Sequence, residues 1–557
     1  MRISKFFLYT LTAVLFVGCG GSADPDLPPE TPEKPEDPKP ELESTCNLTS
    51  LKLKASDNGL PKDIVFTLDK KSGTYSAMYL KWIAKDNPEM LIPVFTTDGE
   101  SVWCGDQKVV SGKTLVSFAD DFVLTVKAEN GDKKEYSVSF NCPQINTELP
   151  VLRLHPETGI VSRDAYVKTK LDIYRSGSAE GVWTADDEPV DVRGRGNSTW
   201  GLPKKPYRIK FPVKFSPVGL DHAKAKSWVI LAHDMDKSLL RNHLAFEISR
   251  ILFNASENYH NEGAVMFTPC SQFVNVYMND DYHGVYQMSD QMEVAKGRID
   301  IDRLKAVDGS DASKITGGYL VETNIHHDEG YPVSFNSSRG IYMDHKYPKD
   351  DDCDIAQYRY MEDFIYKAES ILYSYDFKDP QYGWRKWFDE KTLADYIIVK
   401  ELAGDMDGYT STYFYKRRGI DKIFFGPVWD VDKGWNNDKR TPHGNTLSQL
   451  MIYGGFYMPP YINPDWFHRF WQDEEFRKFV GTRWAQKREA LVSKVLSELD
   501  SRPMSMSKAI RANFSVWDFN YQYSNEANMP ARTYELEIQR MKDLTVQRAE
   551  LLDKLFR

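Results

Sequence analysis

Glu401 to Asp432 reads ELAGDMDGYTSTYFYKRRGIDKIFFGPVWDVD, and this stretch holds two Asp-x-Asp pairs, Asp405/Asp407 and Asp430/Asp432. Between the pairs, a run rich in Tyr, Thr and Phe leads to an Arg-Gly-Ile-Asp turn and a second apolar run, which predicts a β-hairpin. Both pairs then stand at strand ends on the same side of the hairpin. Carboxylates brought together in this way repel each other unless a cation is near, so the stretch predicts a site for a hard metal ion.

A helix is predicted immediately before the first acidic pair. Leu393, Tyr396, Ile397 and Lys400 follow one another at helical spacing, which favours a helix over 393–403 with a partly apolar face. Gly404 is placed to end this helix.

Basic residues are concentrated well upstream of the acidic pairs, in VDVRGRGNSTW (190–200) and KKPYRIKF (204–211). The first segment is predicted to be a strand that runs into a glycine loop, and such a loop can bring backbone N–H groups against an anion. The second is a predicted strand whose alternation places Arg208 and Lys210 on one face. A phosphate chain would satisfy so many neighbouring cations; a solvated basic edge strand is the alternative, at even odds. The five cations are Arg193, Arg195, Lys205, Arg208 and Lys210.

The N-terminus has the features of a bacterial export signal. Residues 1–19 contain Arg2 and Lys5, then an apolar run too short to span a membrane, and end at Cys19. A Cys after a small residue at this place resembles the lipobox of lipoproteins, so Cys19 is predicted to carry the lipid; an ordinary secretory peptide is the alternative. Residues 20–44 are rich in Pro and acidic residues and are predicted to be an extended tether.

A tether with acidic residues soon after the lipid Cys resembles that of Bacteroides-type surface lipoproteins, and a solvated spacer is the simpler reading. The resemblance implies a cell-envelope protein with its lipid anchor in the outer membrane and its folded part exposed at the surface. The net charge of −10 argues against nucleic acid as a partner. The six Cys form no CxxC pair, so their spacing predicts no zinc site.

The folded part is too long for one core, and the predicted fold class is α+β. Residues 45–146 contain short strands separated by Gly and Asn turns, which predicts a β-sandwich; it resembles the Ig-like modules of surface lipoproteins. From 147 to 557 strand-like segments come first and helical patterns follow, over 355–373, 393–403, 476–499 and 532–555. This order favours two lobes with a cleft between them.

Seven segments of the second part, in this order, resemble the CotH family, spore-coat-type proteins with an atypical protein-kinase fold. They are RGRGNSTW…KKPYRIKF, SWVILAHDMDKSLLRN, VNVYMNDDYHGVYQMSDQ, GGYLVE, HKYP, ELAGDMDGYTSTYFYK and GPVWDVD, and they cover roughly residues 150–440.

The resemblance implies that Asp407 is the catalytic carboxylate and that Asp430 holds Mg²⁺, with Asp432 as a second metal ligand or a solvated loop residue. Asp405 is expected to be a helix-end or loop residue rather than a catalyst. ATP would be the phosphoryl donor, since phosphoryl transfer needs a metal on the phosphates and a carboxylate at the hydroxyl.

Lys210 is the candidate for the α- and β-phosphates of ATP, with Arg195, Lys205 and Arg208 nearby, and spacing makes Glu247 its candidate ion-pair partner. One departure matters: where family members often carry an Asn that can hold a second metal, this chain has Thr412.

Two functions are therefore open. The first is a metal-dependent kinase that phosphorylates Ser or Thr of exported proteins, and the ordered motifs and acidic pairs favour it. The second is a non-catalytic surface protein that binds a glycan or a protein partner on the same fold. Thr412 and the scarcity of ATP outside the inner membrane favour the second.

Overall fold

The structure is a computed structural model, and it describes residues 43–60, 63–79, 90–141, 148–178, 180–323, 332–349, 352–438, 447–454, 457–458, 461–462, 465–519 and 531–557. Cys19 and almost all of the predicted tether lie outside these residues. The predictions made for them therefore stay predictions.

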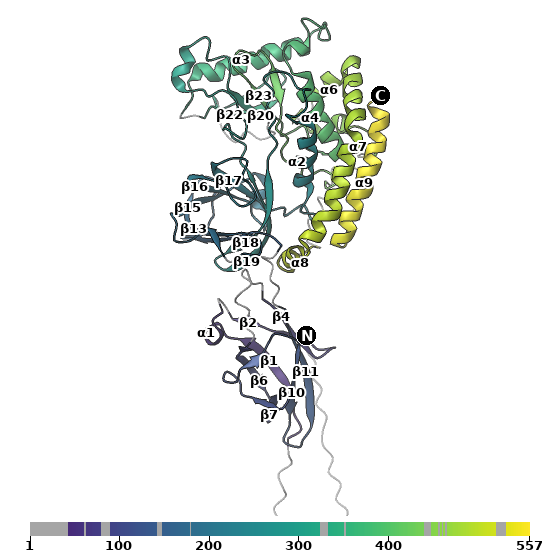
Figure 1. Cartoon of the computed structure of the whole chain (residues 1–557). Helices are drawn as coiled ribbons and strands as arrows, with labels where there is room; N and C mark the ends of the chain where they lie inside the picture. The colour runs from purple at the N-terminus through teal and green to yellow at the C-terminus, as the bar shows by residue number, and fades with distance from the viewer. Residues whose placement is uncertain are drawn as a thin grey trace, which may run out of the picture.

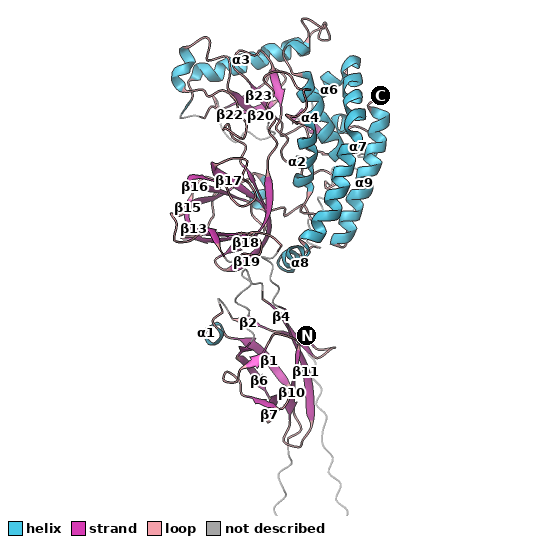
Figure 2. Ribbon diagram, viewed as in Figure 1, coloured by secondary structure: helices cyan, strands magenta, loops and turns pink. Residues whose placement is uncertain are grey.

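The N-terminal part is built almost wholly of strands and forms a separate body at the foot of Figure 2. Leu51 and Leu124, from two different sheets, belong to one apolar core. The predicted strand over 79–83 lies mostly outside the described residues, and its likeness to Ig modules stays a prediction. One sheet has the order β2 (Ile64–Val65), β1 (Leu48–Leu53), β6 (Pro93–Thr97); the other is β3 (Thr67–Asp69), β4 (Thr74–Met78), β11 (Lys133–Asn141), β10 (Phe122–Lys127), β7 (Ser101–Cys104), β8 (Gln107–Val109), beside the pair β5 (Met90–Leu91) and β9 (Val116–Ser117) and the short helix α1 (Ala55–Asn58).

The second part begins with an eight-stranded sheet that closes on itself, because β12 pairs with both β18 and β13. Its inward side chains, among them Ile209 and Trp228, form a core of their own. Alternation along β16 puts Tyr207 and Ile209 inside, as predicted. The strand order is β12 (Val151–Pro156), β18 (Ser271–Met278), β19 (Asp281–Asp290), β17 (Ala225–Leu231), β16 (Tyr207–Phe215), β15 (Val190–Gly194), β13 (Val167–Tyr174), β14 (Gly181–Trp183).

A five-stranded sheet lies beyond this barrel, and helices surround it (Figure 1). The sheet order is β21 (Ser334–Asn336), β22 (Tyr342–Tyr347), β20 (Tyr319–Thr323), β23 (Tyr413–Lys416), β24 (Ile423–Phe425). The helices are α2 (Arg241–Leu252), α3 (Ile355–Leu372), α4 (Glu390–Ala403), α5 (Met451–Gly454), α6 (Asp465–Trp471), α7 (Glu474–Ser505), α8 (Ser507–Val516) and α9 (Tyr534–Leu555). Short 3₁₀ turns cover Ser198–Gly201, Ala306–Ser310 and Trp384–Lys386, and β25 (Tyr457–Met458) pairs with β26 (Tyr461–Ile462).

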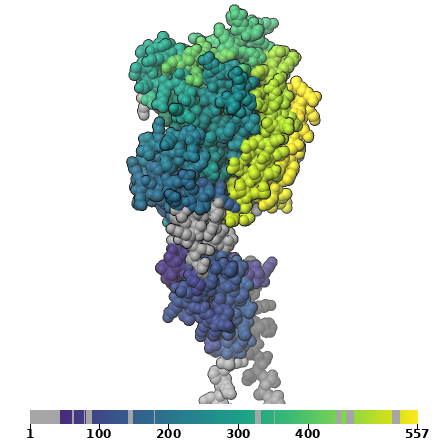
Figure 3. Space-filling view, viewed as in Figure 1, coloured from purple at the N-terminus to yellow at the C-terminus, as the bar shows by residue number. Residues whose placement is uncertain are grey.

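The two long C-terminal helices α7 and α9 run side by side and pack directly on the earlier part of the chain, as the yellow and teal surfaces of Figure 3 show. All four predicted helices are present, within a few residues of their predicted limits. None of the described helices combines the length and the apolar character that a bilayer crossing requires.

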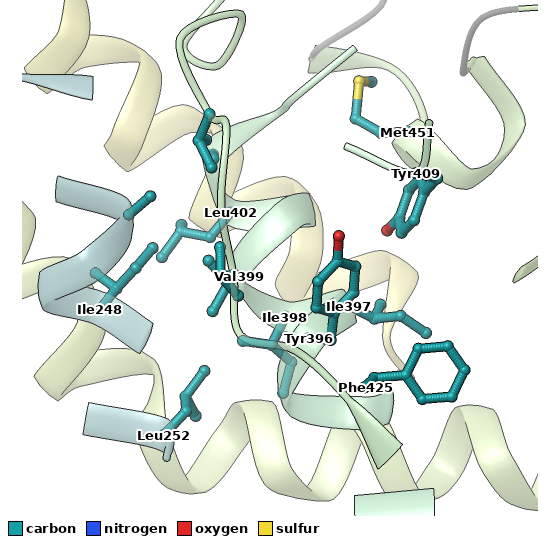
Figure 4. Close-up of a cluster of buried hydrophobic side chains, with 14 of the residues drawn as sticks. Ile248, Leu252, Tyr396, Ile397, Ile398, Val399, Leu402, Tyr409, Phe425 and Met451 are labelled. Atoms are coloured by element: carbon teal, nitrogen blue, oxygen red, sulfur yellow. The ribbon is translucent and has the colours of Figure 1, made fainter. Parts of the chain in front are cut away.

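Helix α4 lies at the centre of the largest core (Figure 4). Every residue from Thr392 to Ala403 is buried, so the predicted amphipathic helix is wrong: helices α2, α6, α7 and α9 and the five-stranded sheet enclose it. Its two charged residues, Lys400 and Glu401, looked like a solvent face in the sequence but are paired inside the protein. Gly404 ends the helix at φ 59°, in the left-handed region, as predicted.

The hairpin after α4 is confirmed as strands β23 and β24. It is a buried hairpin, since β20 pairs with β23 on its other edge and all seven strand residues are buried. One turn prediction is wrong: His345 to Tyr347 belong to β22, which pairs with β20.

Candidate active site

A cavity of about 490 Å³ opens between the barrel and the five-stranded sheet. The barrel side supplies Arg193, Arg195 and Arg208, and the opposite side supplies Asp430 and Asp432. Basic and acidic groups that lie more than 200 residues apart in the sequence thus meet at one hollow. A cleft between two lobes was the prediction from the order of strands and helices.

The two acidic pairs come together at the mouth of the hairpin. Asp430 is exposed to the cavity, Asp432 is half-buried, and Asp407 is half-buried beside them. Burial raises the pKa of Asp432 well above its ordinary value, and the charges of Asp430, Asp405 and Asp407 raise it further. Four carboxylates that disfavour one another's ionisation are a fitting place for a hard divalent cation.

Asp405 differs from its three acidic neighbours because it is fully buried and already has a cation. Its Oδ2 lies 2.9 Å from the Nζ of Lys400. Burial alone would lower the pKa of Lys400, but Asp405 raises it above its ordinary value, so the lysine stays charged. This pairing agrees with the expectation that Asp405 is a structural residue, and it leaves Asp407 as the member of the first pair that faces outward.

Lys400 also fixes the backbone of the second acidic pair. Its Nζ donates to the carbonyl oxygens of Trp429, at 2.9 Å, and of Asp430, at 3.3 Å. Asn242 of α2 accepts the N–H of Val431 at 2.8 Å. Asp430 itself has a φ of 56°, a left-handed conformation that is uncommon outside glycine and that these contacts hold in place.

Arg195 stands on the opposite side of the cavity, at the end of the glycine loop. It is half-buried, its guanidinium carbon lies 5.7 Å from the centre of the Trp429 ring, and no described residue forms a side-chain hydrogen bond with it. Burial lowers the pKa of Arg195, while the charge of Asp430 acts in the opposite direction. The loop is held by Arg163, which donates to Gly196 O at 3.0 Å and to Asn197 Oδ1 at 2.7 Å.

Arg208 is the second cation of the cavity with spare donors. It donates from Nη2 to Ser227 Oγ at 3.0 Å, and its buried Nε has no partner among the described residues. Burial lowers the pKa of Arg208. A guanidinium left partly unsatisfied at the wall of a cavity is suited to an anion that enters it.

The two lysines predicted for the phosphates do not line this cavity. Lys205 donates to the carbonyls of Trp200, at 2.7 Å, and Leu202, at 3.1 Å, so it braces its own loop. Lys210 is exposed, two residues further along β16 than Arg208, in a shallower hollow that adjoins the cavity. Alternation showed correctly that Arg208 and Lys210 share a face, but not how far along the strand the cavity extends.

The proposed pair between Glu247 and Lys210 is wrong, because Glu247 pairs with Lys494 of α7 at 2.9 Å. Thr412 is also turned away from the cavity. It is buried, and its hydroxyl lies 3.2 Å from the phenol oxygen of Tyr396.

Sequence reasoning missed the acidic residue at the end of β20. Glu322 lines the cavity, accepts from Ser411 Oγ at 2.8 Å and pairs with Lys346 at 3.0 Å. Tyr413 lies beside it, and burial, followed by the charge of Glu322, raises the pKa of this tyrosine well above its ordinary value. The motifs GGYLVE and HKYP contain two of these residues, which was the available signal.

A buried arginine connects the acidic loop to the C-terminal helix. Arg241 of α2 donates to Gly434 O at 2.8 Å, pairs with Asp236 at 2.5 Å and pairs with Glu537 of α9 at 2.6 Å. Asp236 was predicted to be the N-cap of the helix; the cap position is Leu240, although Asp236 does accept the N–H of Arg241 at 2.9 Å. The acidic side of the cavity is therefore supported from the far end of the chain.

Comparison with known proteins gives one family. The model described as "CotH kinase protein" matches residues 192–552, which is more than half of the chain and includes both sides of the cavity. No curated protein matches the chain.

Proposed function

The chain belongs to the CotH kinase family, and from that membership and the charges of the cavity we propose that the protein binds ATP with Mg²⁺ and transfers the terminal phosphoryl group to Ser or Thr hydroxyls of exported proteins. The phosphates would lie against Arg195 and Arg208, and the metal would be held by Asp430 and Asp432. Asp407 would act at the acceptor hydroxyl.

The observation that carries this proposal is the position of Arg195 relative to Asp430. Both line the same cavity and sense each other's charge, yet Arg195 has no hydrogen-bonded anion among the described residues. A partly buried guanidinium is stabilised by a bound carboxylate or phosphate. A nucleotide with its cation supplies the anion that Arg195 needs and the positive charge that Asp430 needs.

The fit of a metal rests on the raised pKa of Asp432. A proton on that carboxylate relieves the repulsion within the cluster, and a divalent cation would do so more strongly. When bound, Mg²⁺ would neutralise the oxygens of the transferred phosphoryl group. Asp430, fixed in its unusual backbone conformation by Lys400 and Asn242, would be the oriented ligand.

The outward-facing carboxylate Asp407 is the residue that could receive the proton of the acceptor. As the hydroxyl oxygen bonds to the γ-phosphorus, the bond from phosphorus to the β,γ-bridging oxygen breaks, ADP leaves with that electron pair, and the hydroxyl proton passes to Asp407. Asp405 is unsuited to this step, because it is buried against Lys400.

The second candidate is a non-catalytic protein on the same fold, which binds a glycan or protein partner at the surface. The orientation of Thr412 favours it, because this side chain packs against Tyr396 and does not face the cavity where a second metal would lie. In either case we propose a location in the cell envelope, with a lipid on Cys19 and the residues up to 44 as a tether.

The test uses the purified full chain with ATP, Mg²⁺ and a Ser/Thr peptide mixture, and it measures phosphate incorporated into peptide. Asp407→Asn is expected to lower the rate at least a hundredfold, since general-base contributions are about 10²–10⁴-fold. Asp300→Asn, a change at an exposed carboxylate, is the control and should keep the wild-type rate. No incorporation by the wild type would support the non-catalytic candidate, and equal rates in Asp407→Asn would remove Asp407 from the step.

A further inference from the structure

Three potential metal ligands of different kinds meet on the barrel, away from the residues that line the cavity. His222 lies in the loop before β17, Cys270 directly precedes β18, and Asp290 is the last residue of β19. The pairing of Ser271 with Ser289 places Cys270 and Asp290 opposite each other at the open end of the hairpin. They are 48 and 20 residues apart in sequence, so the absence of a CxxC spacing could not reveal them.

The ligand atoms of this cluster lie within 4.8 Å of one another. His222 Nε2 is 2.8 Å from Asp290 Oδ2, and Cys270 is beside both. In a tetrahedral zinc site with bonds of about 2.0–2.3 Å, neighbouring ligand atoms are about 3.3–3.8 Å apart. The three groups therefore need movements of about an ångström or less to surround an ion, which side-chain rotation provides.

The surroundings of Asp290 resemble those of a positioned metal ligand. Arg298 donates from Nε to Asp290 Oδ1 at 2.7 Å, and the N–H of Cys270 donates to Oδ2 at 2.9 Å. Metal-binding carboxylates are ordinarily oriented by such outer hydrogen bonds. Asp290 is fully buried, whereas His222 is exposed, so an ion and one water could reach the cluster from the side of His222.

The charges of the cluster also fit. A divalent ion with one thiolate, one carboxylate and one neutral imidazole carries no net charge. The two nearby arginines have carboxylates of their own: Arg298 pairs with Glu293 at 2.6 Å, and Arg250 lies 3.5 Å from Glu247. Their positive charge is thus largely balanced before an ion arrives.

We propose that His222, Cys270 and Asp290 bind a borderline-soft divalent ion of the zinc class, with water as the fourth ligand. Thiolate and imidazole select such ions, whereas Mg²⁺ and Ca²⁺ require oxygen ligands. This site is therefore chemically distinct from the carboxylate cluster of the cavity. The competing explanation is a His–Asp ion pair that happens to lie beside a thiol.

The site is connected to the cavity through one arginine. Arg298, which orients Asp290, also donates to Ser227 O at 2.8 Å, and the hydroxyl of the same Ser227 accepts from Arg208 at 3.0 Å. An ion at the cluster would fix Asp290, Arg298 and Ser227 in turn. The proposed role of the ion is to tie the loop before β17 to the β18–β19 hairpin and so to hold the strand that supports Arg208.

The test is titration of the purified full chain with Co²⁺, after reduction of its thiols and removal of metals with a chelator. Tetrahedral cobalt bound to a thiolate has a ligand-to-metal charge-transfer band and intense visible bands, which cobalt on carboxylates lacks. We expect one such ion per chain, displaced by Zn²⁺, and a rise in Tm with Zn²⁺. Binding of Co²⁺ at the cavity carboxylates would not give the thiolate band, so the two sites are distinguishable.

Cys270→Ser is expected to abolish the charge-transfer band, and His222→Asn, at an exposed position, to weaken Co²⁺ binding at least tenfold. Cys353→Ser removes a thiol outside the cluster and should leave the band unchanged. The proposal is overturned if the wild type shows no thiolate band, or if the band survives unchanged in Cys270→Ser. If Cys270→Ser does not fold, the His222→Asn titration decides alone, and wild-type affinity in that variant is equally decisive against the site.

Discussion

The ammonium group of Lys400 lies 2.9 Å from the carboxylate of Asp405, and both side chains are buried. The same nitrogen donates to the carbonyls of Trp429 and Asp430, so one cation holds the two acidic segments against each other. The hairpin that separates these segments in sequence brings them back to the same lysine. Lys400 is therefore the residue on which the geometry of the acidic cluster depends most directly.

Lys400→Met should destabilise the protein severely. The change leaves Asp405 buried without its cation, and breaking a buried pair on one side costs about 3–5 kcal/mol. Urea denaturation of the full chain measures the loss in free energy of unfolding. Lys386→Met, at an exposed lysine, is the control and should stay within about 0.5 kcal/mol of the wild type. Equal losses in the two variants would show that the Lys400–Asp405 pair is not what holds the loop.

Asp430→Asn should abolish the dependence of ATP binding on Mg²⁺. The amide keeps the shape of the side chain but removes the charge that faces the cavity, and with it the main metal ligand. Calorimetry with ATP, in the presence and absence of Mg²⁺, gives the comparison. Wild-type behaviour is expected for Asp300→Asn, whereas an unchanged Mg²⁺ effect in Asp430→Asn would move the metal to other residues.

Arg195→Ala and Lys205→Ala should affect ATP binding differently, although both residues are cations of the same segment. Arg195 faces the cavity, and a hydrogen bond to a charged group contributes about 1.5–3 kcal/mol, so its loss should weaken binding at least tenfold. Lys205 binds carbonyls of its own loop, so its loss should lower stability and leave affinity within a few-fold. The reverse order of affinities would restore the lysine as the phosphate ligand.

His345→Phe should reduce the sensitivity of the protein to acid. Burial among rings such as Phe335 and Tyr358 lowers the pKa of His345 to about 3, so the folded state keeps this ring neutral at pH values where the unfolded chain protonates it. Stability is therefore lost as pH falls below about 6.5, by about 2 kcal/mol at pH 5 from this group alone. Urea midpoints at pH 7 and pH 5 measure the effect, and wild-type and variant curves that fall equally would exclude His345 as the cause.

The elements around the site could be predicted from the sequence because local rules determine them. The hairpin between Asp405 and Asp430 follows from a β-rich run and a glycine turn, and the end of α4 follows from Gly404. The convergence of the two acidic pairs then follows from the hairpin alone.

Other features depended on parts of the chain that local patterns do not contain. Helix α4 appeared amphipathic because the partner of Glu401 is Arg548, almost 150 residues later. Glu322 and Lys346 join the cavity through sheet pairing, and Lys210 misses it because the barrel ends one step earlier along β16. Sequence patterns gave the faces of the strands, but the position of the cavity along them is a tertiary property.

The link from Arg241 to Glu537 has a consequence for the order in which the protein can mature. Glu537 is within the last 21 residues of the chain, yet through Arg241 it steadies the loop that carries Asp430 and Asp432. During synthesis or export from the N-terminus, the barrel strands emerge first and the last helix arrives only at the end. A partly delivered chain would therefore hold its basic cradle but not a finished acidic wall, and we expect it to have no affinity for nucleotide until its final helix has docked.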